Sequence, residues 1–491
     1  MNFSARIFKP AMVALAAVLF CLVGFMQQGL NVDRKAMGLT KMDPLQNAPP
    51  VLAFTTVALG SFRGLIANAL WIRLSDLQLD DKYFEMVQLC DWITKLQPRM
   101  VAVWQFQAWN MAYNISVKFK SPEDRWQWLK RGIVLLRDEG LRYNPNETKL
   151  YRDLSWLFQH KMGANLDDAH MTYKLHWAQE MQDVLGGRPD FKELLNPTTP
   201  EWKARVYKLT NEYKMDPKIV QKVDEEYGPF DWRLPDAHAV YWAEMGRIYA
   251  RPEDQETLRR SVYQSMQQMG IRGGALDPSI TNVTKENFVL WPNLDRVGVI
   301  SKSYETMIAE ETNNPHGLQQ NMETAHKNFL KQAIYMLYQD DRTKEAQYWY
   351  DYLKKINPQA FVGKEANISL EDYAFSQVNE DIGETDQNKI KAAILAMYDQ
   401  EFYYLIRDND ANAENCKNMA RKIYNHYKFK TQGASQERLE LGSLAELQKF
   451  ALDNTLKQLP PWAAAKLRTK LGLPAASPTP AAAAAAGPSG T

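Results

Sequence analysis

The chain has 491 residues, of which 45% are hydrophobic and 11% aromatic, and its 59 basic and 58 acidic residues leave a net charge of +1. This length exceeds that of one hydrophobic core, so we expect either an elongated solenoid or two domains. The charge balance argues against nucleic acid as the main partner, because phosphate binding needs a basic excess or stripe. The three cysteines, Cys21, Cys90 and Cys416, lie far apart without a CxxC motif, which argues against a disulfide framework and a structural zinc site.

The N-terminus carries an apolar segment preceded by positive charge. Residues 11–26 contain no charged side chain, and Arg6 and Lys9 precede them. Such a segment is typical of a cleaved secretory signal peptide or of an uncleaved anchor, and the lack of an A-x-A site favours the anchor. We predict a transmembrane anchor over 11–30, with residues 1–10 in the cytoplasm. The positive-inside rule then places most of the chain beyond the inner membrane, in the periplasm of a Gram-negative-type cell.

A second apolar stretch follows the predicted anchor. Residues 31–50 mix charge, glycine and proline without periodicity, and we expect a linker there. Residues 51–72 are apolar enough to suggest a second membrane span, but Arg63 lies in the middle and a charge there is costly in lipid. A buried or interfacial helix is therefore favoured, and it could also lie on the membrane surface beside the anchor.

Helical hairpins dominate the sequence from residue 70 onward. Helices are predicted over residues 70–79, 83–96, 103–117, 124–143, 150–161 and 167–185. Pro98 and Pro145 follow the second helices of the first two pairs, because proline cannot continue a helix. Residues 51–185 are thus expected to form an N-terminal group of hairpins. The acid pair Asp167-Asp168 is expected to occupy a solvated turn.

The most specific motif consists of Trp242, Met245, Gly246 and Tyr249, spaced as W-x2-[LM]-G-x2-Y. Its two rings, seven residues apart, share one helix face, and the small glycine allows a second helix to approach closely. The motif resembles the first helix of the 34-residue tetratricopeptide repeat. A hairpin of that kind is expected over residues 236–270.

A second unit similar to this repeat covers residues 329–358, where Ala346, Tyr350 and Pro358 follow the repeat's small, aromatic and proline order. Further helices are predicted over residues 389–407, 411–427 and 435–456, which complete a C-terminal group of hairpins over 328–457.

The repeats are degenerate, and residues 186–327 interrupt them except for the hairpin at 236–270. Part of this region is expected to form an ordered excursion with a short strand pair over residues 287–290. The Pro/Ala-rich tail, residues 458–491, is predicted to be disordered from about residue 474.

The resemblance implies an all-α, right-handed superhelical solenoid of hairpins, preceded by one transmembrane helix. We expect a non-catalytic scaffold or adaptor that binds protein partners in a bacterial cell-envelope complex, without nucleic acid, metal or cofactor. Two alternatives stay open: a polysaccharide-active enzyme of the α/α-barrel kind, and a complex subunit that spans the membrane twice.

Candidate partner-binding residues come from two stretches. Trp104 belongs to an aromatic-rich first half, part of which is expected to line a concave face that binds peptides or sugars. By analogy with inner-helix asparagines of the repeat family, Asn110 and Asn114 are expected to clamp a peptide backbone. Arg233 and His238 lie in the chemically richest stretch, and we predict that they contact a partner.

Catalytic and metal-binding chemistry is not favoured. His170 and His176 are six residues apart, with Glu180 following them, and this does not fit the four-residue spacing of a zinc hydrolase. Asp231, Asp236 and His238 are possible catalytic groups, but Asp236 also suits the first turn of a helix, where the positive end favours a carboxylate.

Overall fold

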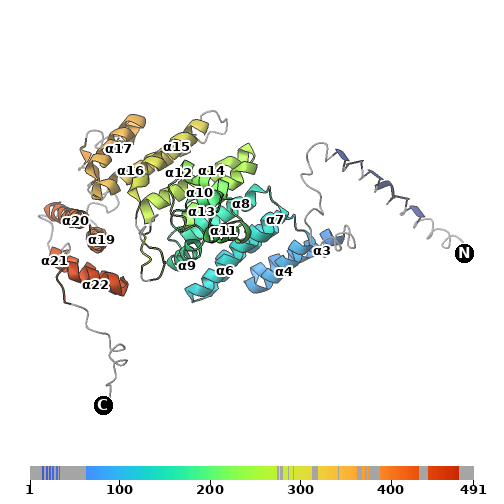
Figure 1. Ribbon diagram of the computed structural model, residues 1–491, viewed down its shortest axis with the longest axis horizontal. Helices are drawn as coiled ribbons and strands as arrows, with labels where there is room; N and C mark the ends of the chain where they lie inside the picture. The colour runs from blue at the N-terminus through green and yellow to red at the C-terminus, as the bar shows by residue number, and fades with distance from the viewer. Residues whose placement is uncertain are drawn as a thin grey trace, which may run out of the picture. The chain divides into compact units, whose positions relative to one another are not determined.

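The computed structural model describes scattered residues between 14 and 33 and most of the chain from 62 to 474. The gaps are residues 274–275, 277–279, 286, 291, 312–318, 341, 362–367, 371–372, 375–386 and 431–440. Every regular element in this described part is a helix (Figure 1). The predicted all-α class is therefore confirmed there. Contacts divide the chain into two units, residues 1–103 and 104–491.

Several predictions fall outside the described residues. These concern the N-terminus at 1–10, most of the linker at 31–50, residues 51–61 of the second apolar stretch, and the tail from 475. The described residues between 14 and 33 are helical, and their large apolar side chains are exposed. No helix built from described residues has both the length and the apolar character needed to cross a membrane.

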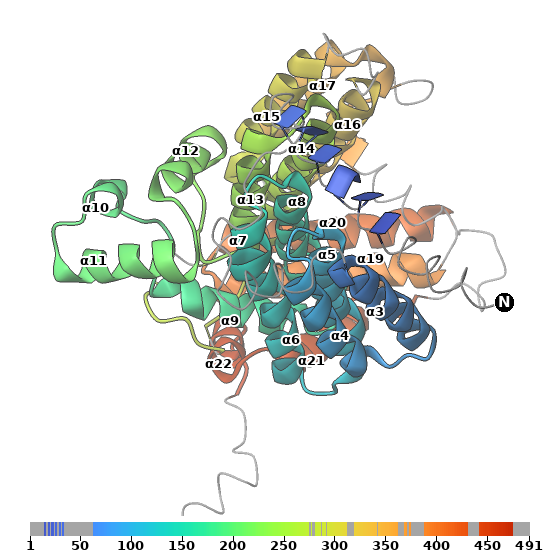
Figure 2. The same cartoon turned by 90° about the vertical axis from the view of Figure 1, so that its right-hand side faces the viewer.

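The first unit contains a hairpin of α3 (Phe62–Leu79) and α4 (Tyr83–Leu96). The two helices lie side by side in Figure 1 and Figure 2. Their connection adopts a left-handed conformation at Asp81, with φ of 57°, which aspartate tolerates better than most residues. The helices bury apolar side chains against each other, among them Ala67, Leu74 and Leu77 of α3 and Met86, Cys90 and Ile93 of α4.

The second unit begins with helices that change their winding along their length. The α-helices are α5 (Val101–Trp109), α6 (Pro122–Val134), α7 (Leu141–Tyr143), α8 (Thr148–Trp156) and α9 (His170–Gln182). Three π-helical segments continue them, η1 (Asn110–Ile115) after α5, η3 (Leu135–Gly140) after α6 and η4 (Leu157–Gly163) after α8. The predicted helices at 103–117, 124–143 and 150–161 thus exist but are not regular α-helices. Such π-helical segments are rare and are frequent at functional sites.

The first interrupting region consists of short helices, α10 (Phe191–Leu195), α11 (Pro200–Tyr207), η5 (Lys208–Glu212) and α12 (Pro217–Tyr227). Figure 2 shows α10, α11 and α12 grouped together. Asp190, Thr199 and Asp216 each accept a hydrogen bond from a backbone N–H at the start of one helix. Such side-chain caps satisfy N–H groups that have no partner within the helix.

The hairpin predicted at 236–270 is formed by α13 (Pro235–Tyr249) and α14 (Pro252–Gln268), continued by η6 (Met269–Gly273). A Cβ atom at Gly246 would lie 2.9 Å from the Cβ atom of Tyr151 in α8 and 3.1 Å from Cδ2 of Leu258 in α14. Glycine is therefore required for both helices to approach α13. The rings of Trp242 and Tyr249 both lie beside the ring of Tyr151, with centroids 6.3 and 5.7 Å away. The prediction that they share one helix face is confirmed.

The strand pair predicted at 287–290 is wrong, because none of these four residues is in a strand. The Asn287 side chain accepts from the Thr284 N–H and donates to the Asn282 carbonyl oxygen, which closes a turn instead. A short 3₁₀ segment, η7 (Leu294–Arg296), and α15 (Val297–Glu311) follow.

The C-terminal part consists of α16 (Gln319–Gln339), α17 (Thr343–Ile356), η8 (Pro358–Ala360), α19 (Gln387–Ile406), α20 (Asp410–Lys430), α21 (Leu444–Gln458) and α22 (Pro461–Lys470). Ala346 and Tyr350 are buried, as their place in the repeat-like unit predicts. Helix α22 lies in the segment expected to be a tail. It packs against α19 and buries Ala463 and Leu467, so helical structure continues beyond the last predicted helix, which ended at residue 456.

Candidate functional site

Two helical segments of the second unit lie side by side, α5–η1 and α8–η4. The Gln105 amide donates to the Asp153 carboxylate over 2.6 Å. Two turns further along, the Tyr113 hydroxyl lies 3.1 Å from Nδ1 of His160. These two contacts join residues that are far apart in the sequence. We call the surface along them the seam.

A line of four rings, made of two stacked pairs, runs along the seam. Trp109 stacks on Tyr113, with ring centroids 4.1 Å apart, and Trp156 stacks on His160, with centroids 4.4 Å apart. Tyr113 and His160 join the two pairs at 6.0 Å. Each pair is four residues apart, which brings side chains together on a helix surface. Trp109 is 49% exposed and the other three rings are partly exposed, so this aromatic row presents ring surface to solvent.

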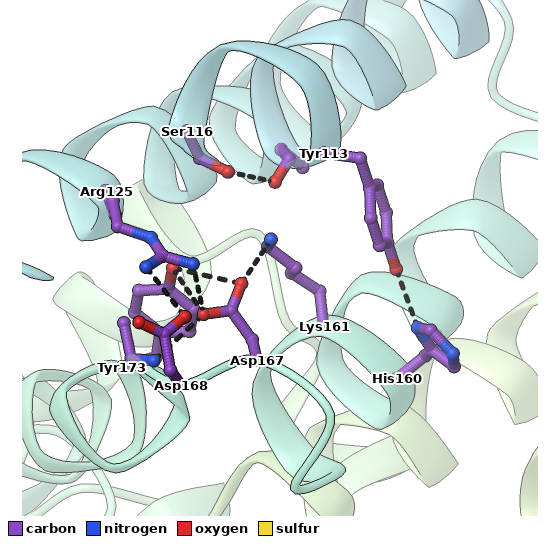
Figure 3. Close-up of polar contacts among 10 residues, drawn as sticks. Tyr113, Ser116, Arg125, His160, Lys161, Asp167, Asp168 and Tyr173 are labelled. Carbon is purple, nitrogen blue, oxygen red and sulfur yellow. Dashed lines mark hydrogen bonds and ion pairs between the residues drawn. The ribbon is translucent and has the colours of Figure 1, made fainter. Parts of the chain in front are cut away.

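A largely buried ionic cluster lies near Tyr113 and His160 of the aromatic row (Figure 3). One oxygen of the Asp167 carboxylate accepts from Arg125 Nη2 over 2.6 Å, and the other accepts from Lys161 Nζ over 2.5 Å. The Ala169 N–H and the Tyr173 hydroxyl also approach this carboxylate, at 2.9 and 3.4 Å. The side chains of Arg125, Lys161 and Asp167 are each less than a tenth exposed.

The charges of the ionic cluster balance. Arg125 also pairs with Asp168 over 2.8 Å, which gives two cations and two carboxylates. Burial alone would raise the pKa of Asp167, but hydrogen bonds from Lys161 and the Ala169 N–H outweigh it and hold that pKa below its usual range. Burial lowers the pKa of Lys161, and the bond to Asp167 opposes this effect. Because its partners neutralise it, the buried carboxylate stays ionised.

The ionic cluster holds the aromatic row in place. Lys161 Nζ lies 5.0 Å from the centre of the Tyr113 ring, a cation–π contact, while the adjacent residue His160 meets the Tyr113 hydroxyl. Burial, followed by the charge of Lys161, lowers the pKa of His160 below its usual range. The row is therefore uncharged at neutral pH. Arg125, Lys161 and Asp167 of the cluster are buried, whereas the rings of the row are at least partly exposed.

Three of the predicted binding residues lie near the seam, but mostly below its surface. Trp104 is buried and stacks on Tyr143, with ring centroids 6.0 Å apart. Asn110 is fully buried, and its side-chain oxygen accepts from the Asn114 amide over 3.1 Å. Only Asn114 is partly exposed, so it is the member of this predicted set that a ligand on the row could reach.

Arg233 and His238 lie in a separate, closed part of the second unit. Arg233 pairs with Asp231 over 2.7 Å and donates to the Ile280 carbonyl oxygen over 2.7 Å. His238 Nε2 donates to the Trp232 carbonyl oxygen over 2.8 Å, and burial lowers the pKa of His238 to about 4. Both side chains are buried, and each donates a hydrogen bond to a carbonyl oxygen of another residue of the chain. Their contact with a partner remains a prediction.

The metal site judged unfavourable from the sequence has no counterpart in the described residues, where no group of three His, Cys, Asp or Glu side chains could hold a metal ion. His170 Nδ1 instead lies 3.1 Å from Lys174 Nζ. Burial and that ammonium lower the pKa of His170 to about 4.

The sequence interpretation missed the ionic cluster. It placed the Asp167-Asp168 pair in a solvated turn, which holds for Asp168, 84% exposed, but is wrong for Asp167, which is buried. One sequence signal was available, since Lys161 lies among Leu157, Phe158 and Met162, and a charge on an apolar helix face requires a partner.

Comparison of the chain with protein-family models, curated proteins and solved structures finds no match. The geometry of the seam is therefore the basis for inferring function. It consists of an accessible, uncharged aromatic row held by a closed ionic cluster.

Proposed function

We propose that this chain is a membrane-anchored, non-catalytic scaffold that binds protein partners in a bacterial cell-envelope complex. The single observation that carries the proposal is the aromatic row. Its four rings form two stacked pairs and are at least partly exposed, although burying large rings stabilises a folded protein. Rigid, partly exposed aromatic side chains are typical of the residues that dominate protein interfaces.

The chemistry of the row suits a peptide segment of a partner. The rings offer apolar surface without charge, and the partly exposed Asn114 follows Tyr113 in the same helical segment. Apolar or proline side chains would pack on the rings, and the Asn114 amide would bind the peptide backbone. Because the ionic cluster fixes Tyr113 from below, little conformational entropy is lost on binding.

The architecture that we propose around this surface is a right-handed solenoid of tetratricopeptide-like hairpins. The close approach of α8 and α14 to Gly246 supports it, because the repeat motif places glycine there for that purpose. The uncharged segment at 11–26, with cations before it, supports a single-pass anchor in the inner membrane and a periplasmic body.

The test is capture of partners after crosslinking in cells, with detergent solubilisation and identification by mass spectrometry. We expect a few envelope proteins in stoichiometric amounts with the native chain. Trp109→Ala should remove most of this recovery without unfolding the protein, because Trp109 is half exposed. Trp462→Ala, which removes a 41% exposed ring from α22, is the matched control and should leave recovery unchanged.

Equal recovery by both variants would remove the aromatic row from the binding surface. Recovery of the chain alone with bound glycan would contradict the scaffold and favour the polysaccharide-active enzyme. The alternative of two membrane spans is tested by topology mapping, which should place a tag after residue 473 in the periplasm and a tag at residue 2 in the cytoplasm.

A further inference from the structure

Helix α3 is apolar on two opposite faces, although α4 covers only one of them. Ala67, Leu74 and Leu77 are buried within the first unit. Phe62, Leu65, Ile66 and Ile72 are between 41% and 70% exposed. A helix on the surface of a water-soluble domain normally directs polar side chains outward, and one that is apolar all round is normally buried in protein or in lipid.

The exposed apolar side chains of α3 form one continuous stripe. Phe62, Leu65, Ile66, Ala69 and Ile72 follow the three- and four-residue spacing that places side chains on one helix face. We call these five residues the outer stripe. They occupy the N-terminal eleven residues of the helix, about 16 Å of its length.

Exposed charge on α3 and in its connection to α4 lies beyond the outer stripe. Arg73 and Asp76 are exposed on the last turns of α3, and Asp80, Asp81 and Lys82 are exposed in the connection to α4. Lys95 and Arg99 are exposed at the C-terminal end of α4, where Gln97 lies beside Gly64 of α3. Along α3 itself, the exposed apolar residues therefore precede the exposed charged ones. This distribution suits a boundary between an apolar phase and water.

We propose that the outer stripe inserts into the surface of a phospholipid bilayer, at the boundary between headgroups and acyl chains, and holds the α3–α4 hairpin on the membrane. This inference rests on the membrane anchor of the proposed function. Residues 31–61 separate that anchor from Phe62. This covalent connection keeps the stripe within reach of the bilayer surface.

Lipid fits the outer stripe better than a protein partner does. The stripe contains no Tyr, Trp or Arg, the residues enriched among the hot spots of protein interfaces, and no polar group that would fix the register of a partner. Acyl chains need neither shape complementarity nor hydrogen bonds. Asp76, Asp80 and Asp81 lie beyond the stripe, where they remain in water and away from anionic headgroups.

The test is photocrosslinking of the full chain in its native membrane. The photoreactive residue p-benzoylphenylalanine replaces, in separate variants, Leu65 and Ile72 of the stripe, Leu22 of the anchor, and Gln88 as an exposed polar position on α4. We expect phospholipid adducts from positions 65 and 72 and from position 22, and none from position 88. In the position-65 variant, Ile72→Glu should cause loss of the lipid adduct, because a carboxylate within the stripe opposes insertion.

The outcomes separate this inference from the anchor proposal. Lipid adducts at position 22 but not at 65 and 72 would overturn the inference and leave the anchor standing. Adducts of positions 65 and 72 with an envelope protein or a second copy of the chain would also overturn it. Lipid adducts at 65 and 72 but not at 22 would support the stripe and contradict the anchor.

Discussion

Two regions of the second unit bury carboxylates in opposite ways. Below the seam, Asp167 is surrounded by the cations Arg125 and Lys161. In the C-terminal helices, Glu401 accepts from the uncharged Gln448 amide, at 3.2 Å to each carboxylate oxygen. In both regions burial raises the free energy of the ionised carboxylate. The charge of the partners then decides whether the carboxylate is ionised.

The C-terminal region contains a second carboxylate with neutral partners. Asp340 accepts from the Tyr404 hydroxyl over 2.6 Å and from the Asn412 amide over 2.7 Å. Burial raises the pKa of Asp340 above its usual range, and burial raises the pKa of Glu401 to about 7. The pKa of Asp167 is instead held below its usual range.

The two regions should therefore depend on pH with opposite sign. Asp167 is more acidic in the folded state, so its stabilisation is present above the ordinary carboxyl pKa and is lost as the pH falls. Glu401 is less acidic in the folded state, so the folded protein binds an extra proton between about pH 4.5 and 7. The stability contributed by Glu401 is then lost as the pH rises through that window.

The largest expected effect is that of Asp167→Asn. Removing the charge leaves Lys161 buried without its carboxylate, which should lower the free energy of unfolding by about 3–5 kcal/mol. Chemical denaturation followed by tryptophan fluorescence measures it. The control is Asp168→Asn, which removes the charge of an exposed partner of the same Arg125. It should lower the free energy of unfolding by about 1 kcal/mol or less. Equal losses would contradict the role given to the buried carboxylate.

The second prediction is that replacing the buried Glu401 stabilises the protein, whereas replacing Asp167 destabilises it. At pH 8, Glu401→Gln should raise the free energy of unfolding by about 2 kcal/mol, because an ionised buried carboxylate is replaced by an uncharged amide. At pH 4 the gain should vanish, since the native carboxyl is then protonated. Denaturation at both pH values checks this, and Glu323→Gln, at an exposed position of α16, should leave the free energy of unfolding unchanged at both pH values. A lower free energy of unfolding for Glu401→Gln at pH 8 would contradict this prediction, because it would show that the ionised Glu401 stabilises the fold.

The third prediction concerns packing between helices of the second unit. Gly246→Ala should lower the free energy of unfolding by about 2 kcal/mol, because the new methyl group meets Tyr151 and Leu258 below normal contact distance. Gly298→Ala in α15 is the matched control. Its methyl group would lie 3.7 Å from Trp349, and the change should be neutral or stabilising by up to about 1 kcal/mol. Thermal unfolding of both variants measures the difference, and equal behaviour would contradict the close-approach account.

The helices could be predicted from the sequence because their signals are local. The pattern of apolar residues and the proline at 98 place α4 at residues 83–96, the bounds that the structure has. The motif around Trp242 predicts both a shared face and close packing at Gly246. The π-helical segments were not predicted, because inserting one residue in a turn leaves no distinct local pattern.

The binding surface could be predicted only in part. The sequence pointed to Asn110 and Asn114 on the correct helical segment, but hairpin spacing does not show which side of the helix the next hairpin covers. Asn110 is buried, and the rings of Trp109 and Tyr113 face the seam instead. His160 joins them across 47 residues, and no short-range pattern encodes that pairing.

The most direct test of the central claim is hydrogen–deuterium exchange of the full chain, alone and with the captured partner. The account predicts that the partner slows exchange in peptides covering residues 105–118 and 153–163, which form the seam. Peptides of α17, which carries the 62% exposed Tyr348, should exchange at the same rate in both states. Protection of α17 with no change along the seam would contradict the account.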